Sequence, residues 1–260
     1  MLSLLLSLAA AAPAPLTPTK SWVVDYSETY CAAVRAFGTA EAPLDLVLRP
    51  SPEGDVLQFF VLKSGGFTMA RHVPVTVGFA GATVEGTALE YGFNKGGRRT
   101  ILVSLANDMV RELPKTRMLT FHGSGIDYAF GLTGMNQVLT ALATCNEDLR
   151  RHWNMTDRAK EAIRSPAKPV YRLMDLFSSD DYPEQALSEE DSGSASVLLL
   201  VDDKGKVADC LLRHTSGNAS LDAQTCIAFR NRARFKPALD AAGKPMRSVY
   251  HQAVSWKARG

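Results

Sequence analysis

The stretch His122-Gly123-Ser124-Gly125 contains the residue types that could carry out covalent catalysis. A serine close to glycines is typical of a nucleophile elbow, where the hydroxyl attacks a carbonyl at a sharp turn between a strand and a helix. The stretch lacks the full Gly-x-Ser-x-Gly frame, and another strand-like run, residues 128–132, follows where a helix would be required. A β-hairpin turn therefore explains these residues better than a hydrolase centred on Ser124.

The histidines and acidic residues do not have the spacing of a metal site. Zinc sites characteristically use CxxC or HxxxH pairs, and neither spacing occurs in the sequence. The acidic pairs Glu189-Glu190 and Asp202-Asp203 fall in expected loops. Each histidine lies in or beside an apolar run, where a partly buried structural role is usual; they are His72, His122, His152, His214 and His251. We predict neither a metal nor a cofactor.

Four cysteines could form two disulfides if the chain is exported, because an even cysteine count in an oxidising compartment favours pairing. Cys31 and Cys145 lie in the first part of the chain, and Cys210 and Cys226 lie in the last part. We predict a Cys31–Cys145 and a Cys210–Cys226 bridge, since each pair would join a strand to a helix within one domain. Without export, buried free thiols are the alternative.

The first residues predict export. Residues 1–14 form an apolar run of Leu, Ser and Ala that ends in small residues, as secretory signals do. The run is shorter than the ~18 residues that span a bilayer. We expect cleavage within residues 9–14, a leader that extends over residues 1–19, and a periplasmic protein without a transmembrane helix. An uncleaved signal would instead attach the protein to the inner membrane.

The net charge of +2 over 260 residues argues against a nucleic-acid-binding protein, and the length predicts two domains. Two local basic clusters are interpreted as solvated surface. The first surrounds Gly96-Gly97 at an expected hairpin tip, and the second lies at the end of an expected helix, where cations suit the helix dipole. The clusters are Lys95, Arg98 and Arg99, and Arg230, Arg232, Arg234 and Lys236.

Residues 20–156 predict a β-rich domain that ends in a helix. Short strand-like runs separated by Gly, Pro, Asn or Asp indicate an antiparallel sheet or sandwich rather than βαβ units. The runs are residues 21–26, 30–37, 44–48, 56–63, 69–77, 86–93, 100–105, 118–122 and 128–132. From residue 135 to 153 apolar residues recur every three or four positions, which predicts an amphipathic helix with Cys145 on its buried face.

A proline-containing segment, residues 157–178, is expected to be a linker. After it comes Tyr182-Pro183 before a short helix, and then strands at 194–202 and 207–214. A turn at Ser216-Gly217 precedes a helix at about 221–234. Phe235 and Pro237 close that helix, and Gly243-Lys244-Pro245 precedes a last strand at 248–257.

This order of elements resembles the C-terminal domain of the TonB energy transducers over residues 179–260. The resemblance implies a small domain with a three-stranded antiparallel sheet packed on helices, so that the whole chain is α+β. It also implies a non-enzymatic envelope protein. The sequence has no proline-rich rod of the kind with which transducers cross the periplasm.

The last strand is the expected partner-binding site, because a strand with no successor is expected to be a sheet edge. An edge can accept a partner strand, and TonB-like domains are understood to dock the TonB box of an outer-membrane transporter in this way. The alternative is an edge covered by the N-terminal domain or by a second copy in a homodimer. The expected residues are Val249, Tyr250, His251, Gln252, Ala253, Val254, Ser255 and Trp256.

Three functional hypotheses follow from the sequence. The first is an energy-transducer-type protein that binds a TonB-dependent outer-membrane transporter, or another envelope protein, by strand addition. The second is a periplasmic scaffold or ligand-binding protein in which the TonB-like fold serves only for assembly. The third is a hydrolase centred on Ser124, which the motif supports least.

Overall fold

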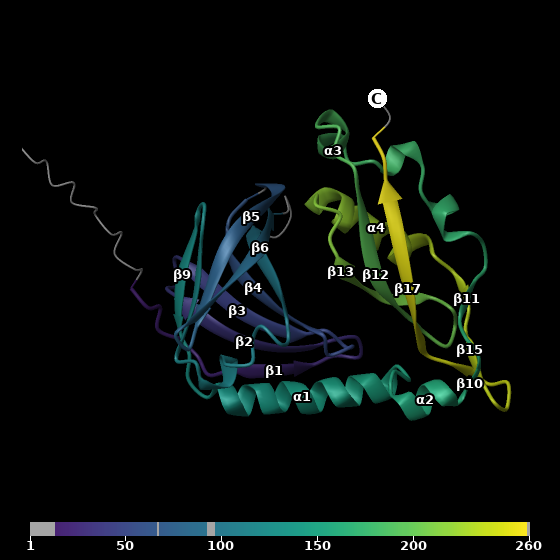
Figure 1. Ribbon diagram of the computed structural model, residues 1–260, viewed down its shortest axis with the longest axis horizontal. Helices are drawn as coiled ribbons and strands as arrows, with labels where there is room; N and C mark the ends of the chain where they lie inside the picture. Colours follow the sequence, from purple (N-terminus) through teal and green to yellow (C-terminus); the bar gives the residue numbers. More distant parts are fainter. Residues whose placement is uncertain (1–13, 67, 93–96, 259–260) are drawn as a thin grey trace, which may run out of the picture.

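The structure is a computed structural model that describes residues 14–66, 68–92 and 97–258 (Figure 1). Most of the expected export signal, and Lys95 of the expected hairpin tip, lie outside these ranges. The described chain is α+β, as predicted. Figure 1 shows a β-rich lobe, a smaller lobe with the last strands, and the long helix α1 running along one side of the first lobe toward the second.

The first lobe is built from one nine-stranded sheet in which all neighbours are antiparallel, in the order β1-β2-β3-β4-β7-β6-β5-β8-β9. Alternate side chains fill its interior, as the period of two requires; in β4, for example, Leu57, Phe59 and Val61 are buried. The strands are β1 (Val23–Tyr26), β2 (Cys31–Gly38), β3 (Pro43–Pro50), β4 (Val56–Ser64), β5 (Thr68–Phe79), β6 (Ala82–Gly92), β7 (Arg98–Ala106), β8 (Met118–Gly123) and β9 (Ile126–Gly131).

The two ends of this sheet are joined by the segment that precedes β1. The Leu16 N–H donates to the Ala129 carbonyl at 2.7 Å, and the Leu16 carbonyl accepts from Gly131 N–H at 2.9 Å, while Thr19 N–H donates to the Ala36 carbonyl at 2.9 Å. The segment therefore bridges β9 and β2, and the sheet closes into a barrel at that end. We expected an antiparallel sheet or sandwich; the structure has a single curled sheet, because this irregular segment supplies the bonds that close it.

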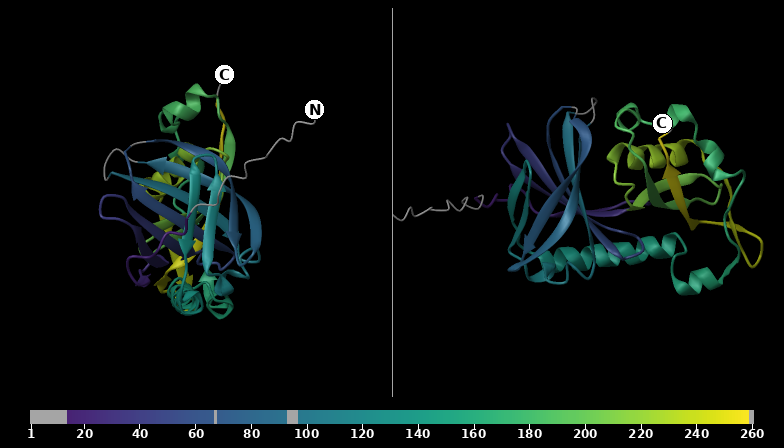
Figure 2. Two further views of the ribbon diagram at one scale, coloured as in Figure 1. Left: turned by 90° about the vertical axis from the view of Figure 1, so that its left-hand side faces the viewer. Right: turned by 45° about the horizontal axis from the view of Figure 1, so that its top comes forward.

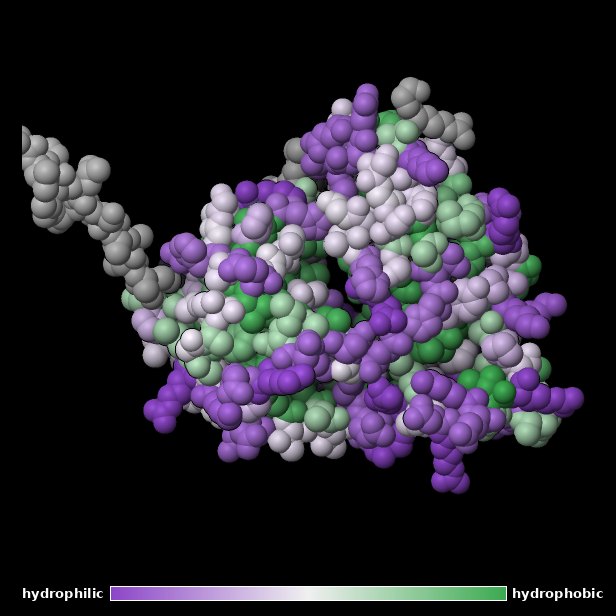
Figure 3. Space-filling model, in the orientation of Figure 1, coloured by the Kyte–Doolittle hydropathy of each residue, from purple (hydrophilic) through white to green (hydrophobic). Residues whose placement is uncertain are grey.

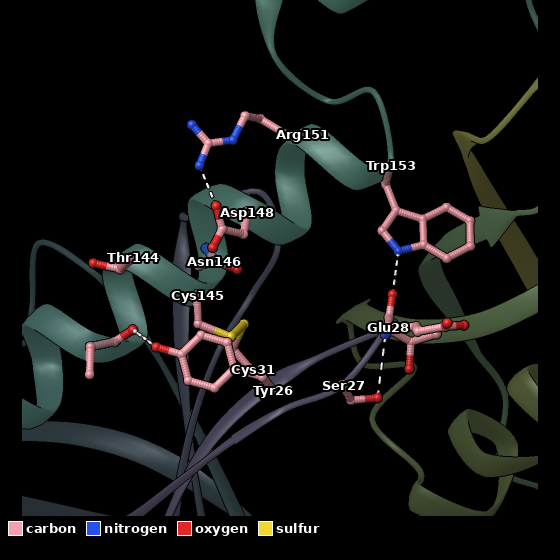
Figure 4. Close-up of a disulfide and its surroundings, with 12 residues drawn as sticks. Tyr26, Ser27, Glu28, Cys31, Thr144, Cys145, Asn146, Asp148, Arg151 and Trp153 are labelled. Carbon is pink, nitrogen blue, oxygen red and sulfur yellow. Dashed lines mark hydrogen bonds and ion pairs between the residues drawn. A yellow bond between two sulfur atoms is a disulfide. The ribbon is translucent and has the colours of Figure 1, made fainter.

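Helix α1 (Met135–His152) packs along the barrel through the expected apolar stripe. Val138, Leu142, Cys145 and Leu149 are buried at spacings of four, three and four residues, which places them on one face. Cys145 forms a disulfide with Cys31 of β2 (Figure 4). Directly after the helix, the Trp153 indole N–H donates to the Glu28 carbonyl at 2.7 Å. These contacts fix the helix to the first two strands. A short 3-10 helix, η1 (Leu113–Lys115), lies between β7 and β8.

The residues expected to form a linker, 157–178, are folded against the second lobe. Two of its strands pair with strands from the end of the chain, β10 with β15 and β11 with β14. The sequence did not indicate this, because strands of two or three residues have no periodicity. The segment contains α2 (Asp157–Glu161), β10 (Ile163–Ser165), β11 (Lys168–Pro169) and η2 (Leu173–Leu176).

The second lobe has the expected sheet and helices. The sheet order is β13-β12-β17, and α4 packs on one face, where Leu221, Ala228 and Phe229 are buried and Cys226 forms a disulfide with Cys210 of β13. The elements are η3 (Ser179–Asp181), α3 (Glu184–Ser188), β12 (Gly193–Val201), β13 (Val207–His214), α4 (Ala219–Arg232), β14 (Phe235–Lys236), β15 (Ala238–Asp240), β16 (Pro245–Met246) and β17 (Ser248–Trp256).

The other face of this sheet packs against the barrel. Leu198, Leu200 and Leu211 are buried in one continuous core with the barrel side chains. Around that contact Arg213 forms ion pairs with Glu53 at 2.8 Å and Asp55 at 2.5 Å, both in the loop between β3 and β4. The two lobes therefore share a core, and the right-hand view of Figure 2 shows them side by side.

Candidate partner-binding edge

Strand β17 lies at the edge of the second-lobe sheet. It pairs along its whole length with β12, from Gly193 opposite Trp256 to Val201 opposite Ser248, and no strand within the described residues pairs with its other side. Figure 1 shows it as the yellow arrow of the second lobe. An unpaired edge presents free N–H and C=O groups to any extended chain that approaches it.

A side-chain hydrogen bond shows which backbone groups of β17 face outward. The Gln252 side-chain amide donates to the Ala253 carbonyl at 2.7 Å, so that carbonyl points away from β12. In an antiparallel strand the N–H and C=O of one residue point to the same side, and the sides alternate. Hence Val249, His251, Ala253 and Ser255 direct their backbone groups to the free edge.

The opposite edge strand gives the same phase independently. Leu199 of β12 lies between Cys210 of β13 and Tyr250 of β17, and it can direct its backbone groups to only one of them. The Cys210 N–H donates to the Asp209 side chain at 2.8 Å instead, so it points outward from β13. Leu199 therefore pairs with Tyr250, which leaves the odd-numbered residues of β17 for the free edge.

The alternate side chains of β17 anchor the strand in the core. Val254 and Trp256 are buried under α4, and the Trp256 indole N–H donates to the Thr225 hydroxyl at 2.9 Å. Tyr250 packs on Phe235, with ring centroids 5.0 Å apart. These three expected site residues hold the strand in place, and their side chains are not free to contact a partner.

The remaining side chains divide between the barrel contact and solvent. Val249 packs against the barrel core, and His251 Nε2 lies 3.4 Å from a Glu53 carboxylate oxygen of the β3–β4 loop. Ala253 and Ser255 are exposed, and Gln252 is half-buried. The barrel thus covers the first residues of the strand from one face, and the accessible part of the edge is centred on Ala253.

The β13 edge is capped. The Asp209 carboxylate, only 7% exposed, accepts from the Cys210 N–H and forms ion pairs with Arg49 at 3.2 Å and with Arg230. A strand that added here would have to displace this carboxylate from an outward N–H. Neither Arg49 nor Asp209 could be identified as a capping residue from local sequence patterns, because their contact joins residues 160 positions apart.

The basic cluster at the end of α4 was expected to be solvated surface, and two of its arginines also form ion pairs. Arg230 pairs with Asp209, and Arg232 forms a two-pronged pair with Asp181 at 2.8 and 3.1 Å. The hydrogen bonds from Arg232 lower the pKa of the Asp181 carboxyl. Both arginines therefore hold elements of the second lobe together, although their side chains remain partly exposed to solvent.

The serine motif forms a hairpin turn. Ser124 and Gly125 connect β8 to β9, and Gly125 has a φ of 76°, a left-handed value that glycine adopts without strain. His122 and Asp127 flank the turn with 3.3 Å between Nδ1 and Oδ1, and both are largely exposed. Within the described ranges no group of three or more His, Cys, Asp or Glu residues could hold a metal ion.

Comparison with known proteins agrees with this geometry. Residues 179–258 match the family model of the Gram-negative bacterial TonB protein C-terminal, which confirms the expected resemblance for the second lobe. This is a family of non-enzymatic energy transducers of the cell envelope. No curated protein matches the chain. Among the described helices, none has both the length and the apolar composition needed to cross a membrane.

Proposed function

We propose that this chain is a periplasmic, non-enzymatic envelope protein whose TonB-like domain binds an extended segment of another envelope protein by strand addition to β17. One observation carries the proposal: in a domain that matches the TonB C-terminal family, the β17 edge is unpaired within the described residues, whereas the β13 edge is capped by Asp209. A TonB-dependent outer-membrane transporter is the partner class that this family implies.

Main-chain pairing would supply most of the affinity. Each outward residue of β17 offers one N–H and one C=O, and a net hydrogen bond contributes about 0.5–1.5 kcal/mol. Ala253 and Ser255 are exposed and have small side chains, so a partner strand could approach this part of the edge without steric hindrance. Gln252 currently bonds the Ala253 carbonyl and would have to release it.

A second candidate function is a periplasmic scaffold or ligand-binding protein in which the TonB-like fold serves assembly. It is favoured by the burial of Leu198, Leu200 and Leu211 against the barrel and by the contact between His251 and Glu53. These contacts place the second lobe in a fixed position relative to the barrel. In this case β17 would pair with a second copy or with nothing.

Site-specific photo-crosslinking distinguishes these functions. We expect a photoreactive phenylalanine at Ala253 to crosslink, in living cells, to a short extended segment of an envelope protein that mass spectrometry identifies. Ala208 is the matched control, because it is also an exposed alanine on an edge strand, but on the capped strand β13. Crosslinks to the protein's own second copy at Ala253 would support the homodimer, and equal crosslinking at both alanines would exclude a specific edge.

A further inference from the structure

A cavity of about 390 Å³ lies between the barrel and the second lobe. Its barrel wall consists largely of apolar side chains that point outward from β4, β6 and β7, including Phe60, Leu89 and Leu102, and its other wall includes Leu212 of β13 and Ala223 of α4. Figure 3 shows a hollow between the two lobes. Small-molecule sites are typically mostly apolar and have volumes of ~300–1,000 Å³.

The sequence of α4 explains why the two lobes do not fill this space. The helix face toward the cavity carries Ala219, Ala223 and Cys226, at spacings of four and three residues. Cys226 is tied to β13 by its disulfide, so all three positions present little bulk. The opposite face carries the large side chains Leu221 and Phe229, which pack on the helix's own sheet. The cavity thus results from small residues at the contact.

Among the described residues that line the cavity, one is a cation, Arg49, and its charge is only partly compensated. Arg49 shares the Asp209 carboxylate with Arg230, so two guanidinium groups face one carboxylate. Among the described residues Arg49 Nε has no hydrogen-bond partner, and burial lowers the pKa of this arginine. A half-buried cation in such surroundings favours an anion nearby.

Asp222, a carboxylate among the described lining residues, is already engaged within its own lobe. It accepts hydrogen bonds from the Thr215 hydroxyl at 2.5 Å and from Ser216 N–H at 2.7 Å. Its charge disfavours a second acidic group on a ligand. The cavity therefore combines a large apolar surface with a cation, Arg49, that can pair with a single negatively charged group.

We propose that this cavity binds a small amphipathic monoacid, with its apolar body between Phe60, Leu102 and the α4 face and its acid group directed to Arg49. The described lining residues do not include any of β17, so the ligand-binding proposal can be tested separately from strand addition. It would give the barrel a ligand-binding role and would place the ligand in contact with both lobes.

Isothermal titration of the full chain with dodecanoate, below its micelle concentration, tests the proposal. We expect saturable one-to-one binding, at least about tenfold weaker binding of dodecanol, and no binding of dodecyltrimethylammonium, because Arg49 supplies a charge-assisted hydrogen bond. Arg49→Gln should weaken dodecanoate binding about tenfold. Arg230→Gln is the matched control, since it removes the other guanidinium from Asp209 but does not line the cavity.

A second pair of variants keeps the test independent of the Arg49 ion pair. Ala223→Phe should fill the cavity and abolish binding, whereas Ile227→Phe, one turn further along α4 and exposed, should bind as the wild type does. Melting curves establish that each variant is folded. The proposal is overturned if the folded wild type shows no saturable dodecanoate binding, if it binds the cationic amphiphile equally well, or if folded Ala223→Phe binds unchanged.

Discussion

Replacing both Cys31 and Cys145 by alanine should lower the free energy of unfolding by about 4–5 kcal/mol. The bridge joins residues 114 apart, and in the loop-entropy model a loop of this length restricts the unfolded chain by that amount. It also holds α1 against β2, so its loss should loosen the helix first. Urea denaturation followed by tryptophan fluorescence under non-reducing conditions measures the change.

The second disulfide provides the control for this prediction. Cys210 and Cys226 are only 16 residues apart, and the same model gives about 3 kcal/mol for a loop of that size. The Cys31–Cys145 double variant should therefore have the lower urea midpoint. The reverse order would contradict the view that the long-range bridge is the main covalent constraint on the fold.

Proline substitutions at neighbouring positions of β17 should affect different properties: one should lower stability, and the other should lower partner binding. Val254→Pro should cost about 3 kcal/mol of stability, because it removes an N–H that pairs with Ala195 of β12 and leaves a buried carbonyl unsatisfied. Ala253→Pro removes an N–H that faces the free edge, where proline is tolerated. This variant should keep a melting curve close to that of the wild type and lose the partner strand.

Thermal melting and binding of a TonB-box peptide, measured on both variants, check this prediction. Ala253→Gly is a suitable control, because it removes the side chain but keeps the backbone donor. If Ala253→Pro unfolds the protein while Val254→Pro does not, the assigned direction of the backbone groups is reversed. If Ala253→Pro stays folded and binds as well as Ala253→Gly, the edge is not the binding site.

Local patterns in the sequence were enough to predict most elements. Alternating apolar residues predicted the strands of the barrel, and a spacing of three or four predicted α1 with Cys145 on its inner face. Glycine and proline between the runs placed the turns, including the hairpin at Ser124. In the second lobe the joint order of turns, helix and strands identified the domain, which the family match confirms.

Contacts between distant residues could not be predicted in the same way. The closure of the barrel by Leu16 and the capping of the β13 edge by Asp209 depend on hydrogen bonds that have no local pattern. The pairing of β10 with β15 likewise involves strands too short to show a period. The outward phase of β17 required two specific side-chain hydrogen bonds, from Gln252 and to Asp209.

One signal for the contact between the lobes was present in the sequence. Residues 197–201 read Val-Leu-Leu-Leu-Val, a continuous apolar run rather than the alternation of a strand with one solvated face. All five residues are buried, with Val197 and Leu199 on the α4 side and Leu198 and Leu200 on the barrel side. The run therefore indicated a strand covered on both faces.

Backbone hydrogen exchange along β17 tests strand addition most directly, using synthetic peptides that carry the TonB boxes of outer-membrane transporters from the same genome. In the free protein the amides of His251, Ala253 and Ser255 should exchange fast, and those of Gln252 and Val254 slowly, because only the latter pair with β12. A bound peptide should slow exchange at Ala253 and Ser255 by about tenfold or more. Peptide binding that leaves these outward amides unchanged would contradict the account.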